Sequence, residues 1–161
     1  MKTFLVLLSL SLVPLLGFAA GTGASSSGNT GSAGSVNNMT ADDHYNKGVA
    51  LSDSGNYSDA LKEFQQAVNL RTGFAEAYNM IGFSYRKLGN LNLSLRNYEK
   101  ALRYKPDFPQ AYEYLGETYL AADDLLHAMK NYFYLKDSGR QEAQELWDKI
   151  VNYVTTKARA S

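Results

Sequence analysis

The chain has 161 residues, and its 16 basic and 16 acidic side chains give a formal net charge of zero. This balance gives no electrostatic support for nucleic-acid binding. The sequence contains no cysteine, which excludes a small disulfide-stapled domain and a lipid-modified cysteine, so the fold must be held by buried apolar surface.

The first 20 residues have the layout of a secretory signal peptide. "MKTFLVLLSLSLVPLLGFAA" carries one charge, at Lys2, followed by an apolar run and then small residues. An uncleaved anchor is the alternative, but the run is short of the about 20 apolar residues that span a bilayer and contains Pro14. We therefore expect an exported protein, periplasmic or secreted, cleaved near Ala20.

A flexible linker is predicted to follow the signal segment. Residues 21–39, "GTGASSSGNTGSAGSVNNM", are mostly Gly, Ser, Thr and Asn and offer little apolar surface to bury. The remaining residues, 40–161, have a length that suits one folded domain.

That domain contains an internal repeat of 34 residues. Four sets of similar residues recur at this offset: Gly48, Gly82, Gly116; Ala60, Ser94, Ala128; Phe64, Tyr98, Tyr132; and Ala67, Ala101, Leu135. A period of this length is the signature of stacked supersecondary units. We place the units at residues 41–74, 75–108 and 109–138.

Each unit is predicted to be a pair of helices. In the second unit, apolar residues recur at helical spacing before and after the turn "LGN", where Gly89 suits a helix C-cap and Asn90 the next N-cap. Capping-box spacing occurs at three predicted helix starts: Thr40 with Asp43, Asp107 with Gln110, and Ser138 with Gln141.

The recurring glycine is expected to mark a close approach between the two helices of a pair. Glycine inside a helix costs about 1 kcal/mol relative to alanine. Gly82 is in phase with small residues on the second helix, and a side chain there would push the helices apart, with Tyr78, Tyr85 and Tyr98 filling the surrounding space.

These residues resemble the tetratricopeptide repeat family. Gly, Tyr, a small residue, an aromatic residue and Ala stand at fixed offsets, with Pro106 near the end of the second unit. The first unit departs from the family pattern at Lys47 and Thr72. The third unit has Asp123-Asp124 where the second has Gly-Asn. The resemblance implies an all-α solenoid of three helix-turn-helix repeats.

A capping helix is expected over residues 139–158. An apolar stripe (Ala143, Leu146, Trp147, Ile150, Val151, Val154) lies opposite a polar face that includes Lys149. Such a helix covers the last repeat of a solenoid. We expect Trp147, the only tryptophan, to anchor it.

Catalytic and metal-binding patterns are missing from the sequence. The histidines, His44 and His127, lie on different repeats, and Asp42, Asp43 and His44 are adjacent on a helix and so point in different directions. Acidic residues in a first turn are favoured by the helix dipole. We expect neither an enzyme nor a cofactor or metal site.

The resemblance implies a concave groove, lined by the first helix of each repeat, that holds a peptide or partner helix. The matching contact residues are Tyr45, Asn79, Phe83, Arg86, Glu113 and Glu117. Phe83 either fills a gap between repeats or anchors a ligand. A family clamp for C-terminal carboxylates needs Lys, Asn and Arg, and the matching positions here do not supply them: Tyr45, Val49, Met80, Gln110 and Tyr114.

The expected function is therefore that of a non-catalytic, exported scaffold or adaptor that binds a protein or peptide in this groove. Membrane contact is expected only through the signal segment, if it is uncleaved. The alternative is a self-associating structural protein of the cell envelope, so a homo-oligomer stays open.

Overall fold

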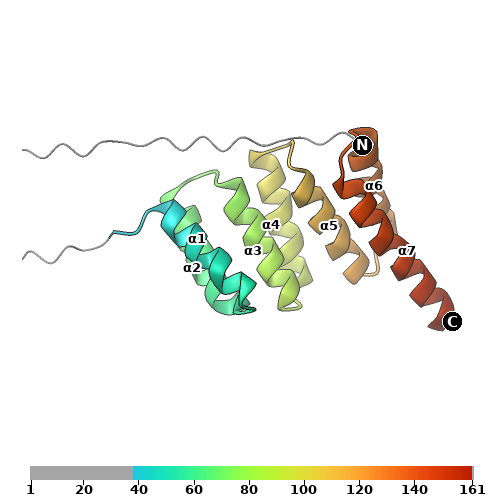
Figure 1. The fold of residues 1–161 in the computed structure, drawn as a ribbon, viewed down its shortest axis with the longest axis horizontal. Coiled ribbons are helices and arrows are strands. Elements are labelled where there is room, and N and C mark those ends of the chain that lie inside the picture. Colours follow the sequence, from blue (N-terminus) through green and yellow to red (C-terminus); the bar gives the residue numbers. More distant parts are fainter. Residues whose placement is uncertain (1–37, 161) are drawn as a thin grey trace, which may run out of the picture. The chain divides into compact units, whose positions relative to one another are not determined.

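The computed structural model describes residues 38–160, and the predicted signal peptide and residues 21–37 of the predicted linker lie outside this range. The described part is all-α (Figure 1). Its helices are α1 (Ala41–Asp53), α2 (Tyr57–Leu70), α3 (Ala75–Lys87), α4 (Leu91–Tyr104), α5 (Pro109–Ala121), α6 (Leu125–Asp137) and α7 (Glu142–Ala160). The predicted fold class, three helix-turn-helix repeats and a capping helix, is confirmed. No helix in this range is long and apolar enough to cross a bilayer.

The first six helices pack as consecutive pairs (Figure 1). Of the first helices, α3 also contacts both α1 and α5, and we call these three helices the first-helix layer. The final helix, α7, packs against both α5 and α6, so it borders the first-helix layer at its C-terminal end. It begins and ends slightly later than predicted, at Glu142 and Ala160.

The turn within each pair depends on a left-handed residue at the same repeat position. Gly55 and Gly89 have φ angles of 78° and 79°, and Asp123 adopts 61° at the equivalent place in the third repeat. Aspartate is one of the few side chains that tolerates this region. The predicted N-cap at Asn90 is confirmed, since its side chain accepts from the Leu93 amide.

The three predicted capping boxes have different outcomes. The Thr40–Asp43 box is confirmed, because each side chain accepts from the other residue's backbone N–H. The Asp107–Gln110 box is wrong, since α5 begins after Phe108 and Asp107 instead accepts two hydrogen bonds from Arg140.

The Ser138–Gln141 box is also wrong. Ser138 ends α6 as its C-cap, and its hydroxyl donates to the Tyr134 carbonyl. It is therefore turned toward the helix that precedes it. The residues that follow, up to α7, form a turn in which Gly139 has a φ of 65°.

The close approach at the repeated glycines is confirmed, with a different partner from the one expected. A Cβ atom added at Gly82 would lie 2.9 Å from the ring of Tyr98, and one at Gly48 would lie 2.6 Å from the ring of Phe64. Both rings are completely buried. The glycines therefore accommodate an aromatic side chain of the second helix, rather than a small one.

The third repeat uses its glycine differently. A Cβ atom at Gly116 would lie 2.6 Å from Leu146 of α7, and Leu146 is completely buried. The ring of Tyr132, at the position of Phe64 and Tyr98, lies 4.9 Å from that of Trp147. The capping helix therefore occupies the space that the second helix fills in the first two repeats.

We predict that Gly82→Ala lowers the free energy of unfolding by about 1 kcal/mol, measured by urea denaturation. Overpacking a core costs about 1–3 kcal/mol, against a helix-propensity gain of about 1 kcal/mol. In a Tyr98→Val background, which lacks the ring atoms, the same change should be neutral or stabilising. An equal cost in both backgrounds would show that the ring is not what requires the glycine.

Candidate functional site

Two of the residues predicted to contact a partner, Tyr45 and Phe83, are half-buried in aromatic clusters on the first-helix layer. The ring of Tyr45 lies 5.0 Å from that of Phe74. The ring of Phe83 lies 6.0 Å from Tyr57 and 5.5 Å from Tyr114, so it contacts residues of the first and the third repeat. Of the two interpretations of Phe83, this position favours packing between repeats, with part of the ring left exposed.

Asn79 and Glu113 are too buried to contact a partner. Asn79 is 1% exposed and Glu113 is 4% exposed. Both occupy the same position in their repeats, where neighbouring helices cover the side chain. The expectation that these two residues line an open groove is therefore corrected.

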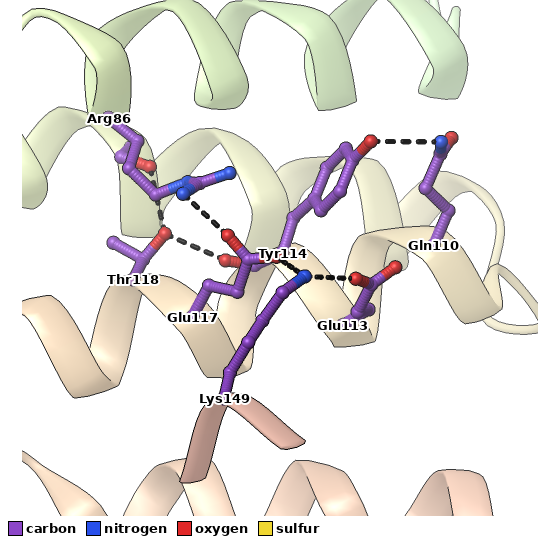
Figure 2. A network of polar contacts seen from close by, with 8 residues as sticks. Arg86, Gln110, Glu113, Tyr114, Glu117, Thr118 and Lys149 are labelled. Atoms are coloured by element: carbon purple, nitrogen blue, oxygen red, sulfur yellow. Dashed lines mark hydrogen bonds and ion pairs between the residues drawn. The ribbon is translucent and has the colours of Figure 1, made fainter. Parts of the chain in front are cut away.

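Charged side chains connect three helices at the C-terminal end of the first-helix layer (Figure 2). Arg86 of α3 pairs with Glu117 of α5 at 2.5 Å. Lys149 of α7 pairs with Glu113 at 2.6 Å and also with Glu117. These four residues form what we call the ionic network. Arg86 and Glu117 were both predicted to contact a partner. They lie on one face, but they pair with each other.

Burial controls the electrostatics of this network. It raises the pKa of the Glu113 carboxyl above its usual value, and the bond to Lys149 offsets that effect only in part. Burial also acts to lower the pKa of Lys149, but its bonds to Glu113 and Glu117 outweigh this and raise it. The ammonium group of Lys149 is therefore held in its charged form between two carboxyl groups.

A pocket of about 440 Å³ opens beside the network. It is lined by residues of α3, α5 and α7: Arg86, Glu117, Leu120, Ala121, Lys149, Asn152, Tyr153, Thr156 and Lys157. Its walls thus combine paired charges with uncharged polar and apolar side chains. This composition suits a ligand that carries both polar and apolar groups, such as a peptide segment.

The contribution of α7 to the pocket was missed from the sequence. Lys149 was expected to face away from the repeats, yet it reaches α5. The sequence does contain a pattern that indicates this face of α7. Polar residues recur there at three- and four-residue steps, at Lys149, Asn152 and Thr156.

The anchor of the capping helix also differs from the prediction. Leu146 is completely buried, whereas Trp147 remains 37% exposed. Ala143 and Ile150 are buried with Leu146. The expectation that Trp147 anchors α7 is therefore wrong: it lies at the edge of the contact, against Tyr132.

Histidine has a structural role in the described residues. Nδ1 of His44 lies 2.7 Å from Oε2 of Glu63, on the second helix of the same repeat. His127 contacts Asp124, the N-cap of its own helix. Within residues 38–160, no group of three or more side chains is arranged to hold a metal ion.

We predict that Lys149→Met lowers the free energy of unfolding at pH 7 by about 1–3 kcal/mol. The figure is below that for a fully buried pair, because the Lys149 side chain is 41% exposed. Without the cation, the folded-state pKa of Glu113 rises further above its unfolded value, so this loss should shrink as the pH falls toward 4.5.

Urea denaturation at several pH values measures this effect, and Lys157→Met provides the control. Lys157 pairs with Asp123 on the surface, where both side chains are exposed. Its substitution should change stability little at any pH. Equal losses for both variants, or a loss for Lys149→Met that does not vary with pH, would contradict the role given to Glu113.

Comparisons with known proteins agree with the repeat fold. Models of the tetratricopeptide repeat match residues 41–73 and 82–122. No curated protein matches the chain. Among solved structures, one of the MamA protein has 27% sequence identity and a TM-score of 0.56, and covers 71% of this chain. The chain spans only 61% and 58% of the lengths of two MamA chains.

Two further structures share the fold at lower identity. The first TPR of Spaghetti (RPAP3), bound to the HSP90 peptide SRMEEVD, has 20% identity and a TM-score of 0.63, and covers 76% of this chain and 94% of its own. The Sgt2 TPR domain from Aspergillus fumigatus has 18% identity and a TM-score of 0.64, covering 74% of this chain and 80% of its own. Together with the helix pairs and the glycine positions, these matches show that the chain carries tetratricopeptide repeats over residues 41–73 and 82–122.

Proposed function

We propose that this protein is an exported, non-catalytic scaffold that binds a segment of another protein on its first-helix layer. The fold is typically a non-catalytic scaffold for protein or peptide binding. The observation that carries the proposal is the pocket between α3, α5 and α7, which remains open beside side chains that are already paired. A partner therefore meets a preformed site and need not break the ionic network to enter it.

Partly exposed apolar side chains extend the proposed surface away from the pocket along the first-helix layer. They come from all three repeats: Tyr45, Val49, Met80, Phe83 and Tyr114. A helix or extended segment laid across them would bury apolar area, while the charges at the pocket would set its direction. The partner segment would thus lie in a groove and be recognised through contacts with these side chains.

The fold shared with Spaghetti does not carry its ligand over to this chain. At the positions matching the family's carboxylate clamp, Gln110 donates to the hydroxyl of Tyr114, and Met80 is apolar. Neither arrangement supplies the positive charge that a C-terminal carboxylate needs. The proposed ligand is therefore not a C-terminal carboxylate held by that clamp.

Export is proposed from residues 1–20 alone, whose charge and apolar pattern is that of a signal peptide. The site of action would then be the periplasm or the cell exterior. We predict that the protein purified from its source lacks this segment and begins near Gly21, as measured by intact mass and N-terminal sequencing. Recovery of a chain that retains residues 1–20 would contradict cleavage.

We predict that Thr156→Trp abolishes partner capture by filling the pocket. Thr156 is exposed and lines the pocket, so the change should leave folding intact. The measurement is affinity capture from extracts of the source, with circular dichroism as a check on folding. One protein should be retained by the wild type and reduced about tenfold or more by the variant.

The matched control is Gln66→Trp, which places the same side chain on an exposed position of α2, outside the first-helix layer. It should capture the partner as the wild type does. If Thr156→Trp retains the same proteins as the wild type, the pocket is not the binding site. If Gln66→Trp loses them instead, the second helices form the binding surface.

A further inference from the structure

Large apolar side chains are exposed mainly at the C-terminal end of the repeat array. Of the nine most exposed in residues 38–160, six lie on α6 and α7: Leu126, Phe133, Tyr134, Trp147, Val151 and Val154. Three of them recur at a four- and a three-residue step on α7, which places them on one side of that helix. We call Trp147, Val151 and Val154 the terminal stripe.

Apart from Trp147, which contacts Tyr132 of α6, the terminal stripe is separate from the contacts that hold α7 to the repeats. Leu146 and Ile150 face the interior and are 0% and 3% exposed, while Val151 and Val154 are 42% and 44% exposed. On the pocket side, Lys149 pairs with α5 and Lys157 pairs with Asp123. The stripe is therefore a third face of α7, and Trp147 connects it to α6 through its contact with Tyr132.

Within the described residues, the opposite end of the array offers no matching apolar surface. On α1 and α2, the only large hydrophobic side chain among the most exposed is Leu70. Head-to-tail stacking of copies would thus place an apolar stripe on a mainly polar surface. An isologous contact, in which the same surface meets itself about a two-fold axis, matches apolar with apolar.

Charge along α7 specifies the direction of such a contact. Asp148 and Arg159 are both exposed and stand 11 residues, about three helical turns, apart, so they lie on the same side of α7 beside the stripe. Two copies of α7 laid antiparallel place Asp148 of each copy toward Arg159 of the other. A parallel arrangement would put like charges together, which is unfavourable.

We propose that the terminal stripe is a self-association surface, on which the α7 helices of two copies pack antiparallel about a two-fold axis. This contact lies outside the pocket, so it does not depend on the proposed groove binding. A dimer formed in this way would leave both pockets open, and would present two binding sites on one particle. Two linked sites raise the avidity for a partner that is itself repeated.

The chain has one built-in probe for this contact. Its single tryptophan is Trp147, so tryptophan emission reports the surroundings of that residue alone. The test measures the mass of the full chain by sedimentation across a concentration series, together with the emission maximum. We expect a mass of two chains and a blue-shifted emission at high concentration, both reverting on dilution.

For the variant Val151→Glu/Val154→Glu, the dissociation constant of the dimer should rise about tenfold or more, so this variant should stay monomeric at concentrations where the wild type associates. Both positions are exposed, so folding should be unaffected. Ser58→Glu/Gln66→Glu adds the same charge at exposed positions of α2 and should associate as the wild type does. Arg159→Glu should weaken the dimer, and adding Asp148→Lys should restore it, because together those changes exchange the charges of the two facing residues.

Three results would overturn the proposal. A single-chain mass with red, solvent-exposed tryptophan emission would show that nothing covers the stripe. A single-chain mass with blue-shifted emission would show that another part of the same chain covers it. A dimer that survives Val151→Glu/Val154→Glu would place the contact on another surface.

Discussion

The spacing between paired helices is the constraint on which the rest of this structure depends. At Gly48 and Gly82 the first helix has no side chain, and a buried ring from the second helix fills the space against its backbone. The small residues Ala60, Ser94 and Ala128 are completely buried as well. Between repeats, the ring of Phe83 contacts Tyr57 of the first repeat and Tyr114 of the third.

The capping helix changes this arrangement at the third repeat. Leu146 takes the place beside Gly116, and Lys149 reaches across to Glu113 and Glu117. The cap is therefore also a wall of the candidate site, which explains why the pocket lies at this end of the first-helix layer. Removing Lys149 would leave the buried carboxyl group of Glu113 without its cation, so the Lys149 contacts hold α7 in place more than they add net stability.

The helices and their order could be predicted from the sequence, because a 34-residue period repeats the same local signals. The turn residues show this well: Asp123 replaces glycine yet keeps the left-handed conformation of Gly89. Burial at the site could not be predicted in the same way. Asn79 and Glu113 lie on the expected face, but their exposure depends on neighbouring helices, and the place of α7 follows from packing at Gly116. Trp147 was misassigned for the same reason.

The most direct test of the account is site-specific photocrosslinking in the source organism. A benzophenone side chain at Asn152, which lines the pocket, should capture a partner protein of defined mass. The same group at Gln66, on the second helix of the first repeat, should capture none. Crosslinks from position 66 but not from position 152 would contradict the claim that the first-helix layer and its pocket form the binding surface.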